Sequence, residues 1–527
     1  MKVFLSLFWT LIPLCLSAQI LTQSNLPIVM IQTGNNEIPD EPKINATMSI
    51  INNGPGMINR VNDMPNEYVG RIGIETRGNS TQGFDKKTYS LELRSSTNQD
   101  SSVNLFGMGK EEDWILHAMV IDKTQLRIPM SFYFSRKMGH YAAKWRYVEL
   151  IIDGDYRGLY IFTERLKRDD DRVDIEKMTR NDVAGDAVTG GYILRIDWLE
   201  EDGFESQFKA QGPQNMFYQW YYPKADDIQP QQELYISNYV TDFEKAVFSP
   251  SYVNPKGKHY SEYIETNSFI DFLLVNEISK NADGYKLSSY LHKDRDSKGG
   301  KLTAGPIWDF DQTYGMSLVC SCHDPTGWTY LQNQDGCEDL DSMPLWWQAL
   351  VSDTAFSQRL QARWRELRQG VFHRDSIFQW IDEHRQLIQP AIDRNYQRWP
   401  DVIGESIWIE PEPIPQSYSA EISYMKDWIG QRLIWMDSNM SSIALDLEPI
   451  TKELAIFPNP VKDHLTIKGH QGDIMQIIGI NGQRMYTAVI MEEEFNVELT
   501  GFAPGMYILA IESEKANYFP MKFMVIP

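Results

Sequence analysis

Alternation of apolar and polar positions predicts strands in the first third of the chain. Residues 68–78 and 87–93 alternate in this way, and 145–164 is typical of a hairpin with Asp153 and Gly154 in its turn. We therefore expect residues 26–197 to consist mostly of strands.

Helical patterns are fewer in this part of the chain. Asp122 is a candidate N-cap for a helix that runs to about Met138, but Pro129 inside it predicts a kink or a later start. Asn267 or Ser268 is a candidate cap for a second helix. Beyond Asp353, apolar residues recur at helical spacing, and we interpret them as core packing: Phe356, Leu360, Trp364 and Leu367, then Ile422, Met425, Trp428 and Leu433.

Two further strands are predicted in the middle of the chain, over 288–294 and 301–309, joined by the turn at 297–300. The second of these strands ends on Asp309 in the run Trp308-Asp309-Phe310-Asp311. A later change in composition, at about 441–452, predicts a linker. After it, residues 453–527 contain short alternating runs separated by turns, which indicate a small antiparallel β-sandwich.

Composition and charge exclude some functions. The chain has 527 residues and a net charge of −22, so a general nucleic-acid-binding role is not expected. One lysine, an apolar run and small residues ending at Ala18 predict a secretory signal peptide over residues 1–18. No later stretch reaches the roughly 18 apolar residues that a transmembrane helix requires.

Three cysteines remain after the signal peptide: Cys320, Cys322 and Cys337. In an exported protein we expect one disulfide among them and one remaining thiol. The alternative is a metal site that includes His323, but the C-x-C spacing suits tetrahedral zinc poorly.

Three acidic residues suggest phosphate chemistry. The turn at 297–300 can fold Asp309 and Asp311 back beside Asp283. Phosphoryl transfer needs one carboxylate to orient the attacking hydroxyl and others to hold divalent metal against the phosphates. From spacing alone, a loop cap at Asp283 and a turn at Asp309 explain the pattern equally well.

A second candidate site lies in the first half. Arg77 and Gly78 end one predicted strand, and Lys86 and Lys87 begin the next after a polar loop. Such a loop with a following lysine can bind phosphates, but glycine and serine occur in any hairpin.

Taken together, these segments resemble the spore-coat-protein-H (CotH) kinase family, which has an atypical protein-kinase-like fold. The similarity runs in order through RGNS (77–80), KKTYSLEL (86–93), EDWILHA (112–118), DKTQLR (122–127), 146–165, GGYILRID (190–197), NADGY (281–285) and GPIWDFD (305–311).

The resemblance implies roles for individual residues. Asp283 matches the catalytic aspartate, and Asp309 matches the metal-binding aspartate, with Asp311 as a second carboxylate. Ser288 stands where relatives from spore formers often carry a metal-binding asparagine, so a hydroxyl replaces an amide oxygen there.

Further roles are implied in the first half. Lys87 would contact phosphate, and Glu164 would lie near the adenine. Arg77 and Arg127 are candidates for phosphate contacts or for structural ion pairs.

The last 75 residues or so resemble the type A C-terminal sorting domain of the type IX secretion system. The matching residues are Phe457-Pro458-Asn459-Pro460, Gly505-Met506-Tyr507 and Lys522-Phe523. This implies handling by the type IX secretion machinery of a Bacteroidetes-type bacterium and a secreted or cell-surface location.

The expected fold class is α+β: a two-lobed kinase-like domain over 19–440, followed by a small all-β immunoglobulin-like sandwich. The expected function is transfer of phosphate from ATP, with Mg²⁺ or Mn²⁺, to Ser or Thr hydroxyls of a protein substrate. The alternatives are a weakly active or inactive surface module that binds matrix or glycan as an adhesin, and another metal-dependent phosphate-transfer or hydrolytic enzyme.

Overall fold

The structure is a computed structural model that describes residues 21–211, 215–331, 343–443, 455–468, 471–480, 482–492, 494–512 and 521–527. The predicted signal peptide, most of the predicted linker and Cys337 lie outside these residues. The chain forms two compact units. Unit 1 comprises residues up to Val120, Lys144–Arg165 and Glu383–Ile403, and unit 2 comprises Ile121–Ala143, Leu166–Asp382 and the chain from Gly404 onward.

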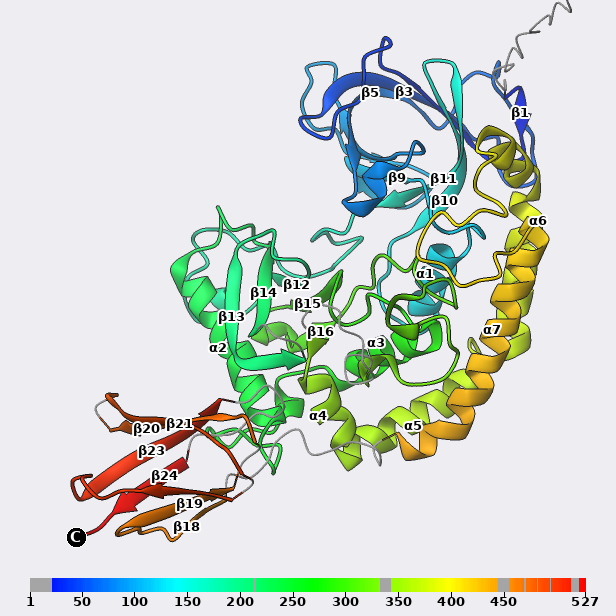
Figure 1. Cartoon of the computed structure of the whole chain (residues 1–527). Helices are drawn as coiled ribbons and strands as arrows, with labels where there is room; N and C mark the ends of the chain where they lie inside the picture. Colours follow the sequence, from blue (N-terminus) through cyan, green and yellow to red (C-terminus); the bar gives the residue numbers. More distant parts are fainter. Residues whose placement is uncertain are drawn as a thin grey trace, which may run out of the picture. The chain divides into compact units, whose positions relative to one another are not determined.

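Unit 1 contains a closed barrel of seven strands (Figure 1). Around the barrel the order is β10-β11-β9-β6-β5-β3-β2, with β2 and β10 parallel and the other neighbours antiparallel. The strands are β2 (Ile28–Gln32), β3 (Ile44–Ile51), β5 (Tyr68–Arg77), β6 (Thr88–Arg94), β9 (Asp113–His117), β10 (Trp145–Ile152) and β11 (Asp155–Glu164). Two short pairs accompany it: β1 (Gln23–Ser24) with β4 (Asn59–Arg60), and β7 (Val103–Asn104) with β8 (Lys110–Glu111).

The predicted strands of this unit are confirmed. Alternate residues fill the barrel, for example Ile72 and Ile74 on β5, both fully buried, since successive side chains of a strand point to opposite faces. The hairpin turn also lies where it was predicted. Asp153 and Gly154 both have positive φ, 48° and 82°, as two-residue hairpin turns require.

A buried carboxylate ties the barrel to a distant helix of the same unit. Glu149 on β10 is fully buried and accepts hydrogen bonds from Ser24 Oγ at 2.6 Å and from the Tyr156 hydroxyl. Arg394, on helix α6 (Arg374–Arg398), forms an ion pair with it. The arginine supplies the opposite charge that a buried carboxylate needs.

Unit 2 combines a six-stranded sheet with helices (Figure 1). The sheet has the order β16-β15-β12-β14-β13-β17, with β12 (Tyr192–Ile196), β13 (Gly203–Gln211), β14 (Asn215–Tyr222), β15 (Ser289–Lys293), β16 (Leu302–Ala304) and β17 (Met343–Pro344). The helices of this unit, besides part of α6, are α1 (Arg127–Lys137), α2 (Pro230–Val247), α3 (Thr266–Ser279), α4 (Trp346–Ser352), α5 (Thr354–Arg368) and α7 (Tyr418–Asn439).

The later start that Pro129 predicted for the first helix is confirmed, whereas the N-cap at Asp122 is wrong, as are the caps predicted for the second helix at Asn267 or Ser268. Helix α1 begins at Arg127, because Asp122 accepts a hydrogen bond from the Arg127 backbone N at 2.8 Å and the residues between them are not helical. This late start places Pro129 in the first turn, where no intrahelical N–H is required. Helix α3 is capped by Glu265, whose carboxylate accepts from the Ser268 N at 2.6 Å. The apolar faces predicted in α5 and α7 are buried, as expected.

The C-terminal region is all-β. One sheet has the order β18-β19-β22 and the other β21-β20-β23-β24, and side chains of both belong to one buried apolar cluster. The strands are β18 (Ala455–Phe457), β19 (His464–Lys468), β20 (Ile474–Gly479), β21 (Arg484–Val489), β22 (Glu494–Glu498), β23 (Gly505–Glu512) and β24 (Met521–Val525).

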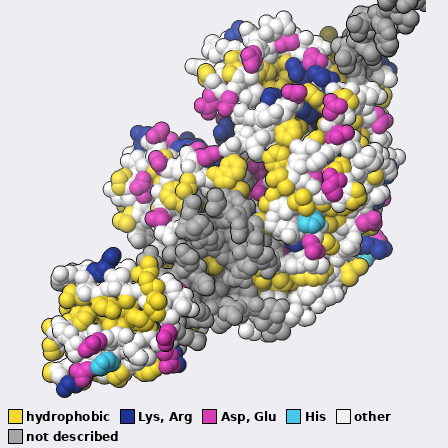
Figure 2. Space-filling view, in the orientation of Figure 1, with side chains coloured by type: hydrophobic (Ala, Val, Ile, Leu, Met, Phe, Trp, Pro, Cys, Tyr) yellow, Lys and Arg dark blue, Asp and Glu magenta, His cyan; other side chains and the backbone are white. Residues whose placement is uncertain are grey.

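The fold class is therefore α+β with a C-terminal all-β region, as predicted at this level. Acidic and basic side chains are interspersed over the face shown in Figure 2, with hydrophobic side chains between them. Over the part of the chain that the structure describes, no helix combines the length and apolar character needed to cross a membrane.

Candidate active site around Asp283 and Asp309

Strand pairing brings the candidate residues of unit 2 to one edge of its sheet. Ile196 at the end of β12 pairs with Ser289 at the start of β15, and Ala304 at the end of β16 pairs with Leu291. The Gly305 N still donates to the Tyr290 O at 2.8 Å. Because these pairs are antiparallel, the chain leaves β12 and β16 at the end where it enters β15.

The predicted strand that ends on Asp309 is shorter than expected. It ends at Ala304, and residues 305–309 have no regular secondary structure. Asp309 itself has a φ of +53°, in the left-handed region that residues other than glycine seldom adopt. Trp308 and Phe310 are buried on either side of it, while Asp309 and Asp311 are half-buried.

Ser288 contacts Asp309 directly. Its Oγ donates to Asp309 Oδ2 at 3.0 Å, and Ser288 also has a positive φ, +44°. Two neighbouring left-handed residues joined by a hydrogen bond form a local geometry that is costly and is often found at functional sites.

Asp283 reaches the same region from the loop after α3. The backbone N of Ala282 donates to the Gln312 O at 3.2 Å, so the loop runs beside the segment that follows Asp311. The side-chain Nε2 of Gln312 donates to Asp283 Oδ2 at 3.1 Å.

A buried ion pair between Glu277 and Arg432 holds the Asp283 loop in place through Tyr285. The Tyr285 hydroxyl donates to Glu277 Oε1 at 2.8 Å, and Arg432 on α7 lies 3.0 Å from Glu277 Oε2. The side chains of Glu277 and Arg432 are both fully buried. The position of Asp283 therefore depends on the packing of α3 against α7.

The acidic side chains affect one another's proton affinity. Burial, followed by the charges of Asp309 and Asp283, raises the pKa of Asp311 to about 8. Burial also raises the pKa of Asp197 to about 6; the Arg195 guanidinium opposes the rise and the Asp309 charge adds to it. Nearby like charges disfavour the ionised form of a carboxyl group.

Asp197 is a member of this group that the sequence did not single out as a site residue. It follows the last residue of β12 and lies next in register to Ser288. The only sequence signal for it is its place at the end of the strand-like GGYILRID segment.

The donor chemistry fits a divalent cation held together with a phosphate-bearing ligand. Three or more His, Cys, Asp or Glu residues whose metal-ligating atoms lie within 4.8 Å of one another can hold a metal ion. Among the described residues only Glu111, Glu112 and Asp113 form such a group. In that group Glu111 Oε1 already accepts the backbone N–H groups of Glu112 and Asp113. Mg²⁺ is commonly bound by one or two carboxylates together with phosphate oxygens and water, so Asp309 and its neighbours need no complete protein cage.

Arg127 has a structural role. Its Nη1 lies 2.6 Å from Asp122 Oδ1, and both side chains are almost fully buried. Its Nε donates to the Thr313 O at 2.9 Å. Of the two alternatives for Arg127, the structure supports the ion pair, which fixes the segment after Asp311.

The other three candidates, Arg77, Lys87 and Glu164, belong to unit 1. Arg77 pairs with Thr88, so Arg77 and Lys87 lie at the same end of the β5–β6 pair. Lys87 is half-buried, and its Nζ donates to the Gln82 O at 2.5 Å. Lys86 is 5% exposed; its Nζ donates to the Leu159 O at 2.7 Å and lies over the Tyr160 ring.

Glu164 is fully buried in unit 1. Its Oε2 accepts the backbone N–H of Lys144 at 2.8 Å, and the Lys144 Nζ lies 3.7 Å from its Oε1. Asp283, Ser288, Asp309 and Asp311 therefore lie together in unit 2. Arg77, Lys87 and Glu164 belong to unit 1.

The cysteines follow the expected disulfide chemistry. Cys320 is disulfide-bonded, and Cys322 is a buried thiol whose pKa burial raises to about 12. A disulfide at Cys320 removes one ligand of the alternative metal site. Cys337, the third cysteine, lies outside the described part.

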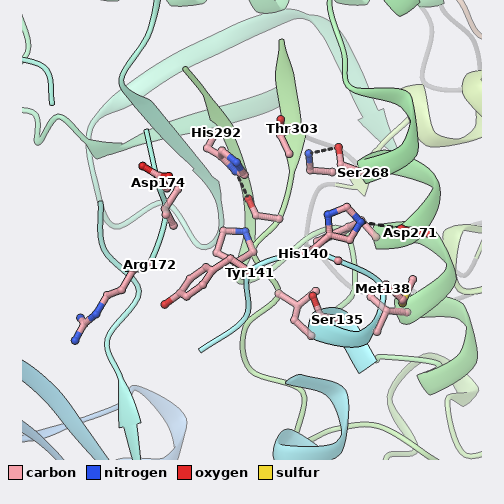
Figure 3. A pocket seen from close by; sticks show the side chains of 18 residues that line it. Ser135, Met138, His140, Tyr141, Arg172, Asp174, Ser268, Asp271, His292 and Thr303 are labelled. Carbon is pink, nitrogen blue, oxygen red and sulfur yellow. Dashed lines mark hydrogen bonds and ion pairs between the residues drawn. The ribbon is translucent and has the colours of Figure 1, made fainter. Parts of the chain in front are cut away.

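Unit 2 also has a cavity away from these acidic residues. Its volume is about 260 Å³, and its lining includes His140, Asp271 and His292 but none of the four acids described above (Figure 3). His140 Nε2 lies 2.8 Å from Asp271 Oδ2, and His292 Nδ1 lies 3.0 Å from the Gly305 O. Arg363 pairs with the same Asp271, at 2.8 Å, so this carboxylate is held by two partners.

Comparisons with known proteins agree with the motifs. The family model described as CotH kinase protein matches residues 74–436, and the model described as secretion system C-terminal sorting domain matches residues 455–526. A search of curated proteins finds no match. The sorting domain indicates export by the type IX secretion machinery to the cell surface or the medium. Because the first model covers more than half of the chain, this protein belongs to the CotH kinase family.

Proposed function

We propose that the protein is an exported atypical kinase that transfers phosphate from ATP, with Mg²⁺ or Mn²⁺, to Ser or Thr hydroxyls of a protein substrate. The observation that carries the proposal is the convergence of Asp283, Asp309 and Asp311 at one sheet edge, in a chain of this family. The proposal includes a kinase-like, two-lobed arrangement and an immunoglobulin-like C-terminal sandwich.

Each side chain has a distinct role in this proposal. Asp283 orients the substrate hydroxyl and accepts its proton as the hydroxyl oxygen bonds to the γ-phosphorus of ATP and the bond from that phosphorus to the ADP oxygen breaks, so that ADP leaves. Asp309 and Asp311, with the Ser288 hydroxyl beside Asp309, hold the cation. The cation, when bound, neutralises the charge on the phosphate oxygens.

Residues of unit 1 are assigned to the nucleotide. Lys87 and Arg77 contact the phosphates as cations from one end of the β5–β6 pair. Glu164 lies near the adenine. The protein partners are the substrate and the type IX secretion machinery.

The second candidate function is a weakly active or inactive surface module that binds matrix or glycan. The observation that favours it is Ser288, since a hydroxyl is a weaker ligand than an amide oxygen, in a site that has no complete cage among the described residues. The third, another metal-dependent phosphate-transfer or hydrolytic enzyme, would use the same acids.

Thermal shift with ATP and Mg²⁺ or Mn²⁺ separates these functions. We expect ATP plus metal to raise the Tm of the wild type. Asp309→Ala should abolish that rise. Asp283→Ala should keep the rise but lose phosphoryl transfer, measured as incorporation of radiolabelled phosphate from ATP. Asp375→Ala, an acid 71% exposed on α6, is the matched control. Absence of any stabilisation of the wild type by nucleotide and metal would reject the kinase and favour the binding module.

A further inference from the structure

Gln312, the residue after Asp311, makes two contacts with the Asp283 loop. Its backbone O accepts from the Ala282 N at 3.2 Å, and its side-chain Nε2 donates to Asp283 Oδ2 at 3.1 Å. It therefore joins the loop after α3 to the segment that carries Asp309 and Asp311.

Two donors fix the direction of the Gln312 amide. Its Oε1 accepts from Trp408 Nε1 at 2.9 Å and from Ser317 Oγ at 3.2 Å. An indole N–H can only donate, so the amide oxygen has to face Trp408. The NH₂ group then has to face Asp283, which settles the two orientations that an amide can take.

The opposite orientation would place the amide oxygen against the Asp283 carboxylate. Two acceptors facing each other repel and leave both without a donor, whereas an N–H donated to a carboxylate favours its ionised form. Trp408 therefore determines, through Gln312, which group meets Asp283.

We propose that Gln312 is a positioning residue that holds Asp283 for catalysis, and that Trp408 fixes the direction of its amide. The inference rests on the proposed function, in which Asp283 meets the substrate hydroxyl. The hydrogen bond to Oδ2 limits rotation of the Asp283 carboxylate. Proton transfer requires the accepting oxygen to be aligned with the substrate hydroxyl.

Steady-state kinetics of the mature full-length protein test the role. Gln312→Ala should lower kcat about tenfold with the KM for ATP nearly unchanged, and should move the acidic limb of the pH–rate profile to higher pH. Gln312→Glu, nearly the same shape, adds a negative charge and should lower kcat further. Trp408→Phe keeps an aromatic ring but removes the indole N–H, so the Gln312 amide is free to turn. This variant should lower kcat by an intermediate amount.

The ATP-plus-metal thermal shift of each variant controls for folding and for nucleotide binding. A Gln312→Ala variant that binds normally and keeps the wild-type kcat and pH profile overturns the inference. So does a Gln312→Ala variant whose only change is in KM.

A second measurement does not depend on activity. In protein labelled with ¹⁵N-glutamine, the Gln312 side-chain cross-peak is identified by its loss in Gln312→Ala. It should shift in Asp283→Asn and in Trp408→Phe, but not in Asp375→Asn. If the wild type lacks phosphoryl transfer while these shifts occur, the proposed function fails and the Gln312 contact stands. If neither variant shifts the peak, the inference fails even for an active kinase.

Discussion

Ser288 Oγ donates a 3.0 Å hydrogen bond to Asp309 Oδ2, and both residues have a left-handed backbone. The bond places a hydroxyl next to the carboxylate proposed to hold the cation. A serine is short, and its single oxygen is a weaker donor to a metal than an amide oxygen. Asparagine tolerates a positive φ better than most residues, so this position can accept it.

Ser288→Asn should therefore strengthen the cation site. We expect the Mn²⁺ concentration that half-saturates the ATP-dependent thermal shift to fall severalfold in Ser288→Asn and to rise severalfold in Ser288→Ala. Titration of Mn²⁺ at fixed ATP measures both. Equal midpoints in the wild type and Ser288→Ala would remove Ser288 from the site.

The two neighbouring lysines of unit 1 should behave differently. Lys86 is buried and bonds the Leu159 O, so Lys86→Ala should lower the Tm by removing a buried contact. Lys87 is half-buried, so Lys87→Ala should leave the Tm nearly unchanged. The same variant should weaken ATP binding about tenfold, because it would lose one charged contact with the phosphates. Calorimetric ATP titration measures the affinity. An unchanged affinity in Lys87→Ala would show that Lys87 is not the phosphate ligand.

The ion pair under the Asp283 loop predicts a large stability effect. Arg432→Met leaves the Glu277 carboxylate buried without its cation, which costs roughly 3–5 kcal/mol. Urea unfolding measures the loss. Adding Glu277→Gln should recover part of it, because the remaining side chain is then neutral. A double variant no more stable than Arg432→Met would mean that the charge is not the cause.

Glu421 on α7 makes stability depend on pH. It is 5% exposed, and burial raises its pKa to about 7, against the opposing charges of Arg127 and Lys123. The folded state thus binds the proton more tightly than the unfolded state, so stability falls as pH rises from about 4.5 to about 7. Glu421→Gln imitates the protonated form.

We expect Glu421→Gln to have a higher Tm than the wild type at pH 8 and a similar Tm at pH 5. Differential scanning calorimetry across this range measures the difference. A constant difference between wild type and Glu421→Gln at all pH values would contradict the assignment.

Local pattern was enough to predict many elements. The strand at 68–78, the Asp153-Gly154 turn and the buried face of α5 depend on residues close in sequence, and all three are present. The strand predicted to reach Asp309 stops at Ala304, because Pro306 has no N–H to continue the ladder. Pro306 is visible in the sequence, so this early end could have been predicted from it.

Contacts between distant residues could not be predicted in the same way. The parallel pairing of β2 with β10 closes the barrel, but neither strand indicates its partner. Gln312 meets Trp408, 96 residues further on, and Asp197 joins the acids only through the β12–β15 register. The family motifs indicated Asp283 and Asp309 as candidates, whereas the contacts of Gln312 and Asp197 needed the structure.

The Glu149 ion pair has a consequence for the order in which parts of the protein can fold. Arg394 follows Glu149 by 245 residues. Strand β2 can pair with β3 early, but it cannot find its parallel partner β10 until Glu149–Ile152 has been synthesised. During translation or export, the first unit thus cannot be completed until Arg394, far beyond the barrel strands, has been synthesised. A fragment cut after Arg165 would contain every barrel strand and still bury a carboxylate without its cation, so it is a poor choice for expression on its own.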